Sequence, residues 1–183
     1  QYSKILKSRP KDLLIYTNVA NEYSQLGEKE KATQTMKEFV ANNPGNGNGH
    51  YFLSLYFIMQ RRFELAMQEL DQAISVRPDA LVYTGFKGDI FYYKDDPEEA
   101  ARFYRAWLDN TKNDGEKLGP AISLSYIDIL KGRPEEALMR LKSYQKLFEK
   151  FEKTYPLNFH ITRGFVDMAS QMPELALEEF KKA

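Results

Sequence analysis

The sequence contains no cysteine, which excludes disulfide bonds, thiolate metal ligands and cysteine nucleophiles but leaves the cellular compartment open. It has no apolar run near the roughly 20 residues that a membrane-spanning helix needs. It also has no excess of either charge, because 26 basic residues balance 26 acidic ones and no basic block occurs. We therefore expect neither membrane insertion nor nucleic-acid binding, since the latter requires a positive surface for the phosphate backbone.

The composition is that of a folded chain. Of the 183 residues, 43% are hydrophobic and 28% are charged, close to the average of globular proteins. This composition argues against disorder for the bulk of the sequence. The length fits one domain or one repeat array that can bury a sizeable core.

A repeat of fixed period runs through the sequence. Prolines recur at one constant interval, at Pro10, Pro44 and Pro78. Alanines keep the same interval and then continue after two slightly longer steps, at Ala32, Ala66, Ala100, Ala137 and Ala176. Five copies in phase indicate one structural unit used five times.

Each unit has the pattern of two helices. In the first complete unit, residues spaced i, i+3, i+4 and i+7 form one helix face, at Tyr16, Val19, Ala20 and Tyr23. Gly27 can adopt the left-handed conformation that ends this helix. A second helix then carries Ala32, Met36 and Phe39 and ends before Pro44.

This pattern resembles the tetratricopeptide repeat, a helix–turn–helix unit with the same period as the prolines. The matching residues are Tyr16, Val19, Ala20, Tyr23, Ala32 and Pro44. The resemblance covers almost the entire chain and implies an all-α fold, an α-solenoid in which ten or eleven helices form antiparallel pairs in a right-handed superhelix. The expected units are residues 1–12 (partial), 13–46, 47–80, 81–117, 118–156 and 157–183 (partial).

Both ends of the sequence fall inside units. Tyr2, Ile5 and Pro10 stand where a second helix ends, and Ala183 falls partway along another second helix. The sequence also begins without a methionine and shows no polar cap of the kind that repeat arrays need. We expect a piece of a longer array.

The resemblance also implies a binding groove, because the first helices of this family line the concave side of the superhelix. On that face this sequence places large apolar and aromatic residues where solvent would favour charged ones. The candidate groove residues are Tyr51, Leu55, Ile58, Met59, Asp89, Tyr92, Tyr93, Tyr126, Ile129 and Phe165. The alternative is that neighbouring helices or further units cover them.

Charged residues occupy columns that are apolar in other units. Lys87 and Arg163 align with Val19, whereas Asp128 and Asp167 align with Tyr23. Because unpaired buried charges are costly, these side chains should pair or reach water. Arg163 and Asp167 can pair along one helix. A polar groove patch and slightly rotated helices with solvated charges are the two interpretations, of which we favour the second.

Two units are longer than the others. Residues 109–120 are rich in turn formers and predict an extended loop. The following second helix is predicted from about Pro134 to Tyr155, with an apolar stripe at Ala137, Leu141, Tyr144, Phe148, Phe151 and Tyr155. The extra turns either pack on the fifth unit, which we favour, or form a docking surface.

No motif predicts catalysis, a metal or a cofactor. The segment from Gly45 to Gly49 lacks the strand and the Lys-Ser/Thr of a phosphate loop, so we interpret it as a flexible link. His50 and His160 are three units apart and are interpreted as packed core residues. The acidic pairs at the starts of second helices are explained by the helix dipole.

Some family members hold a chaperone's C-terminal carboxylate with Lys, Asn and Arg side chains in the groove. The matching positions here are Thr17, Asn21, Phe52, Val82 and Phe86, of which only Asn21 fits. The resemblance therefore argues against this chaperone clamp.

The favoured hypothesis is a non-catalytic protein–protein interaction scaffold that binds a peptide or helix of a partner protein in the aromatic, apolar groove. The alternative makes the array a regulatory or positioning arm of a larger multidomain enzyme or sensor. A helical enzyme ranks last, because no constellation of catalytic residues is found.

Overall fold

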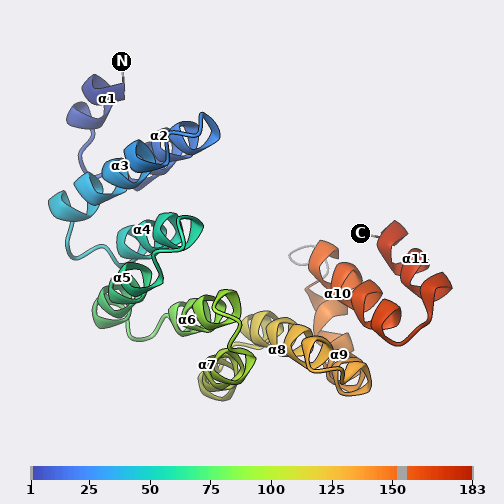
Figure 1. Ribbon diagram of the computed structural model, residues 1–183. Helices are drawn as coiled ribbons and strands as arrows, with labels where there is room; N and C mark the ends of the chain where they lie inside the picture. The colour runs from blue at the N-terminus through green and yellow to red at the C-terminus, as the bar shows by residue number, and fades with distance from the viewer. Residues whose placement is uncertain (1, 152–155, 183) are drawn as a thin grey trace. The chain divides into compact units, whose positions relative to one another are not determined.

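The computed structural model describes residues 2–151 and 156–182 and is all-α, as predicted (Figure 1). Its helices are α1 (Tyr2–Ser8), α2 (Leu13–Gln25), α3 (Lys29–Asn42), α4 (Gly47–Met59), α5 (Phe63–Val76), α6 (Val82–Tyr93), α7 (Pro97–Asn110), α8 (Leu118–Leu130), α9 (Pro134–Lys150), α10 (Pro156–Ala169) and α11 (Pro173–Lys182). A short 3-10 helix, Asp114–Lys117, precedes α8. Within the described ranges there are eleven α-helices and no strand, which agrees with the predicted helix number and class.

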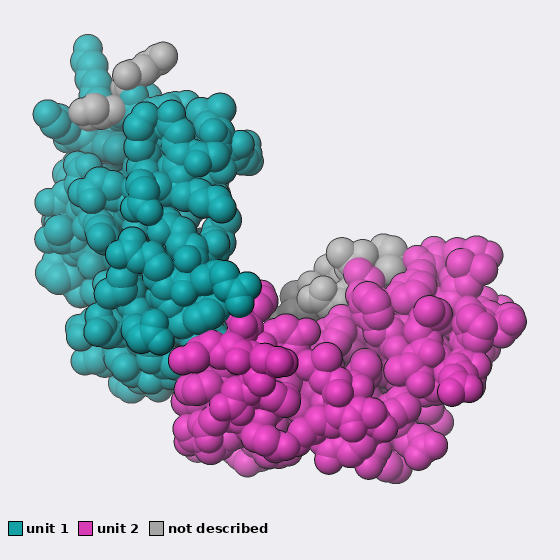
Figure 2. All heavy atoms as spheres, in the orientation of Figure 1, with its two compact units in different colours: residues 1–90 teal, residues 91–183 magenta. Residues whose placement is uncertain are grey.

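The chain divides into two compact units, residues 1–90 and residues 91–183 (Figure 2). Unit 1 contains the helix pairs α2–α3 and α4–α5 and the start of α6, whose last residues belong to unit 2. Unit 2 contains α7 and the pairs α8–α9 and α10–α11. The predicted boundaries of the single repeats and the right-handed twist of the whole array stay predictions.

The turn inside each helix pair has the same backbone geometry in all five repeats. One residue of each turn is left-handed, with φ between 58° and 77°, at Gly27, Arg61, Asp95, Gly132 and Gln171. The next amide donates to a carbonyl five residues earlier, at 2.8–2.9 Å, in the pairs Glu28–Tyr23, Arg62–Phe57, Asp96–Phe91, Arg133–Asp128 and Met172–Asp167. These bonds satisfy carbonyls at the end of the first helix. They also confirm the predicted alignment of Asp128 and Asp167 with Tyr23.

Replacing Gly27 by Ala should destabilise the first turn by about 1 kcal/mol, because a left-handed conformation brings a Cβ too close to the next carbonyl oxygen. A Cβ on Gly27 would meet no other atom within 4 Å, so the effect isolates the backbone term. Urea unfolding followed by circular dichroism measures it. Gly45→Ala is the matched control, because Gly45 also has an open surrounding but no left-handed φ. An equal loss in both variants would contradict the assignment.

Small residues allow the helices to pack closely in both compact units. The predicted alanine positions are all fully buried, at Ala20, Ala32, Ala66, Ala100, Ala137 and Ala176, and Gly88 is buried as well. In unit 1 the Tyr16 ring packs edge-on against Phe39, with their centroids 5.1 Å apart. The repeat pattern therefore encodes the core of each unit.

Two segments predicted as loops are partly helical. The link around Gly45 ends at Asn46, whose side chain caps α4 by accepting from the Gly49 amide at 3.0 Å. A Cβ on Gly49 would come within 2.7 Å of the Phe39 ring, so this glycine permits close packing rather than flexibility. The loop predicted over 109–120 is shorter, because α7 continues to Asn110 and α8 begins at Leu118.

The long second helix ends earlier than predicted. Helix α9 stops at Lys150, and the predicted end at Tyr155 lies outside the described residues. It still has 17 residues, compared with 14 in each of α3, α5 and α7. Phe148 near its end is buried in one cluster with Val166 of α10. The extra turn therefore packs on the fifth repeat, as we favoured.

Candidate functional site

In unit 1 the predicted groove residues lie on α4 and α6. The α4 residues Tyr51, Leu55 and Ile58 are half-buried, whereas Met59 at the end of that helix is 57% exposed. Asp89 on α6 is also half-buried. The spacing of the α4 residues by three or four positions gives one helix face, so these side chains form a partly open apolar surface.

Tyr51 lies in a cluster of aromatic rings. Its ring centroid is 4.6 Å from that of Phe86, 5.0 Å from that of Phe52 and 5.8 Å from that of Tyr83. Burial is the main reason why the pKa of the Tyr51 hydroxyl is raised to about 12, and the negative charge of Asp89 adds to it. The negative charge of Asp89 therefore acts on the Tyr51 hydroxyl, whereas a shared groove for the two residues stays a prediction.

Hydrogen bonds tie the successive first helices of unit 1 to each other. The Tyr56 hydroxyl donates to Asn21 Oδ1 at 2.7 Å and joins α4 to α2. The Tyr83 hydroxyl donates to Asn48 Oδ1 at 2.6 Å and joins α6 to α4. Sequence patterns alone identified neither pair. These bonds hold the first-helix face of unit 1 in a defined arrangement.

In unit 2 the predicted residues come from three helices. Tyr92 and Tyr93 at the end of α6 are 39% and 54% exposed, and their ring centroids are 5.7 Å apart. Tyr126 and Ile129 of α8 are half-buried, and Phe165 of α10 is 48% exposed. The rings of Tyr92, Tyr93 and Phe165 are therefore open to solvent in this unit.

Tyr126 and Phe165 lie together across α8 and α10. Their ring centroids are 6.1 Å apart, and the Thr162 hydroxyl donates to the Tyr126 oxygen at 3.3 Å. Phe165 also meets Phe180 of α11 edge-on, at 5.5 Å. This second aromatic group belongs to unit 2, whereas the Tyr51 cluster belongs to unit 1. A single continuous groove through both sets stays a prediction.

The charged residues in apolar columns are paired rather than solvated, which corrects our favoured interpretation. Asp128 is 5% exposed and accepts from Arg133 and Arg140, each at 2.8 Å. Asp167 is fully buried and accepts from Arg163 Nε at 3.2 Å, the local pair that the spacing predicted. Burial of a carboxylate is tolerated here because each has a guanidinium partner.

Lys87 also has a partner of opposite charge. Its ammonium group pairs with Asp71 of α5, and its side chain is only 16% exposed. The lysine is therefore directed to the second helix of the preceding repeat.

Both histidines pair with a glutamate of the same repeat. His50 is 7% exposed, as expected of a packed histidine, and its Nδ1 lies 2.7 Å from Glu69 Oε2. His160 is half-buried and has the same distance to Glu179. Sequence analysis missed both glutamates, although the identical separation of 19 residues in the two pairs was a usable signal. The pairs link the two helices of their repeats.

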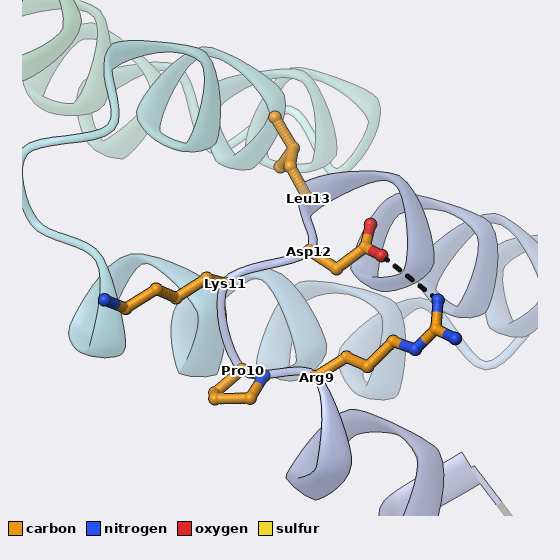
Figure 3. Close-up of a pocket in the computed structure, with 5 residues that line it drawn as sticks. All are labelled: Arg9, Pro10, Lys11, Asp12 and Leu13. Carbon is orange, nitrogen blue, oxygen red and sulfur yellow. Dashed lines mark ion pairs between the residues drawn. The ribbon is translucent and has the colours of Figure 1, made fainter.

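One hollow lies away from the predicted residues, at the turn between α1 and α2 (Figure 3). It is a shallow depression open to solvent, with a volume of about 620 Å³, and is lined by Arg9, Pro10, Lys11, Asp12 and Leu13. The Arg9–Asp12 ion pair in it is 3.7 Å long and largely exposed, so it contributes little free energy. We assign no function to this hollow.

The described residues contain neither a metal-binding cluster nor a membrane-spanning helix. Within residues 2–151 and 156–182, no group of three or more His, Asp or Glu side chains is placed to hold a metal ion. In the same part of the chain, no helix is both long and apolar enough to cross a membrane.

Comparison with known proteins identifies the repeat. Residues 13–46 match the tetratricopeptide repeat model, and no curated protein matches the sequence. A tetratricopeptide repeat protein from Parabacteroides merdae is 22% identical, with a TM-score of 0.77 over 99% of this chain and 68% of that chain. PilF from Pseudomonas aeruginosa is 16% identical, with a TM-score of 0.66 over 91% and 72% of the two chains. YrrB is 16% identical, with a TM-score of 0.52 over 99% and 89%.

These similarities show a shared helical-repeat fold. Such solenoids present extended surfaces that typically serve as scaffolds for protein–protein interaction rather than as catalysts. Residues 13–46 thus match a tetratricopeptide repeat by sequence, and the described chain is similar in fold to tetratricopeptide repeat proteins.

Proposed function

We propose that this chain binds a peptide or a helix of a partner protein on its first helices, with the predicted groove residues of unit 1 and those of unit 2 as contact residues. The observation that carries the proposal is the exposure of large apolar and aromatic side chains on those helices. Met59, Tyr92, Tyr93 and Phe165 are each between 39% and 57% exposed.

The chemistry of these side chains suits protein recognition. Tyrosine combines a large apolar ring with a hydroxyl that can hydrogen-bond at an interface, and methionine adapts its shape to different partners. Burying an exposed aromatic ring against a ligand releases its apolar area from water, so a few such anchors usually dominate the binding free energy. The half-buried Tyr51, Leu55 and Tyr126 would add further apolar contact area.

The comparison with YrrB adds support of a general kind. That structure is described as a tetratricopeptide protein with an unusual peptide-binding site. The shared fold supports peptide binding as a use that the same architecture can serve. The residues that would contact a ligand in this chain are argued from its own exposed side chains.

Replacing Tyr92 and Tyr93 together by Ala should weaken partner binding by more than about 1 kcal/mol, or roughly fivefold in Kd, because both exposed rings lose their contact area. The partner is first found by pull-down with the chain, and its affinity is then measured by isothermal titration calorimetry. Far-ultraviolet circular dichroism should show an unchanged helix content.

Met139→Ala is the control for this experiment. Met139 is 63% exposed but lies on α9, a second helix, so its loss should leave the affinity unchanged. Full affinity in the double tyrosine variant would contradict the proposed surface.

A further inference from the structure

The first-helix face of unit 1 combines an aromatic cluster with a carboxylate. The rings of Tyr51, Phe52 and Phe86 lie together. The ring centroid of Tyr51 is 5.0 Å from that of Phe52 and 4.6 Å from that of Phe86. Asp89 follows Phe86 by three positions on α6, so both side chains lie on one face of that helix. The negative charge of Asp89 also contributes to the raised pKa of the Tyr51 hydroxyl.

One charged side chain occurs among the predicted groove residues of unit 1. Among the predicted groove residues of unit 1, which are Tyr51, Leu55, Ile58, Met59 and Asp89, only the aspartate is charged. The nearest lysine along α6, Lys87, is paired with Asp71 on α5. The aromatic cluster therefore stands beside a negative charge, and the other predicted groove residues of unit 1 bring no positive one.

We propose that Tyr51, Phe86 and Asp89 form a pocket for one basic side chain, arginine or lysine, of the segment that binds unit 1. The inference rests on the proposed function and specifies the chemistry of the partner: an apolar segment with a basic residue at one defined position.

The physical basis has two parts. A guanidinium or ammonium group is attracted by the electron-rich face of an aromatic ring, and the attraction grows when the group is partly removed from water. Tyr51 and Phe86 are half-buried, so a group that binds against them is partly removed from water. A carboxylate offers about four lone-pair sites, so Asp89 can accept from a ligand in addition to a donor within the chain. Because its hydroxyl pKa is about 12, Tyr51 stays neutral at physiological pH and adds no competing charge.

The test uses the whole chain and a displayed library of random octapeptides. Peptides selected on the wild-type protein should show arginine or lysine enriched at one position between apolar residues. Selection on Asp89→Asn should keep the apolar preference and lose the basic one. Glu38→Gln is the matched control, because it removes an exposed carboxylate from the second helix α3 and should keep both preferences.

A second measurement changes the ligand instead of the protein. A selected peptide is synthesised with its arginine replaced by citrulline, which keeps the shape and removes the charge. The wild-type protein should bind the citrulline peptide at least about fivefold more weakly, since one partly buried ion pair is lost. Asp89→Asn should bind the two peptides equally. This comparison on the wild-type protein stays decisive even where Asp89→Asn folds poorly.

The outcomes separate the two proposals. Enriched peptides without a basic position, equal binding of the two peptides by the wild-type protein, or a basic preference that survives in Asp89→Asn would overturn the pocket and leave peptide binding intact. Absence of any enriched peptide would overturn both.

Discussion

Replacing Asp128 by Asn should lower the free energy of unfolding by about 2–3 kcal/mol, because a side chain that is 5% exposed loses its charge, both ion pairs and one of its two hydrogen bonds. The amide that replaces it also turns an N–H group toward one of the two guanidinium groups, which can only donate. Arg133 and Arg140 keep side-chain exposures of 40% and 26%, so water can solvate them after the change and limits the loss.

Arg140→Gln provides an internal comparison for this prediction. It should cost less than Asp128→Asn, because Arg133 still neutralises the buried carboxylate. Asp109→Asn is the control at an exposed end of α7 and should change stability by less than about 0.5 kcal/mol. Urea unfolding measures all three. Equal stabilities of Asp128→Asn and the wild-type protein would show that the pair contributes no net stability.

Replacing Ala66 by Leu should destabilise the chain by about 1–3 kcal/mol, because the larger side chain overpacks a contact without free space. Ala66 is fully buried in α5, in one cluster with Leu53, Phe57 and Leu70. The added atoms can be accommodated only if α4 and α5 separate or neighbouring side chains leave their preferred rotamers. Thermal unfolding should show a midpoint lower by about 2–4 °C for each kcal/mol.

Ala41→Leu is the matched control for this substitution. Ala41 lies near the end of α3 and is exposed, so the same added atoms should meet water rather than protein. Its expected effect is within about 0.5 kcal/mol. An unchanged midpoint for Ala66→Leu would mean that this alanine column does not mark a close helix contact.

The local features of the repeats could be predicted from the sequence. The constant period of the repeat places Ala32 and Ala66 at equivalent positions, and both are fully buried. Gly27 was expected to be left-handed at the end of a first helix, and it has φ = 77°. The spacing of Arg163 and Asp167 predicted their ion pair. The turn at Gly27 and the Arg163–Asp167 pair depend on residues within a few turns of one another, and helix periodicity relates their positions directly.

Other features required the tertiary structure. Sequence spacing showed Asp128 in an aromatic column, but it did not show that Arg140, from the next helix, would make the buried carboxylate tolerable. It also did not relate Tyr51 to Phe86, which meet across α4 and α6. Helix ends depended on packing as well: Gly49 belongs to α4, where the absence of a Cβ admits the Phe39 ring.

The sequence by itself thus determined the repeat, its helix pairs and the identity of the residues on each helix face. The tertiary structure decided which of those side chains meet, which charges are neutralised and how much of each ring remains open to solvent. The physical reason is that periodicity describes one helix at a time, whereas burial, pairing and exposure depend on the side chains that a neighbouring helix brings into contact.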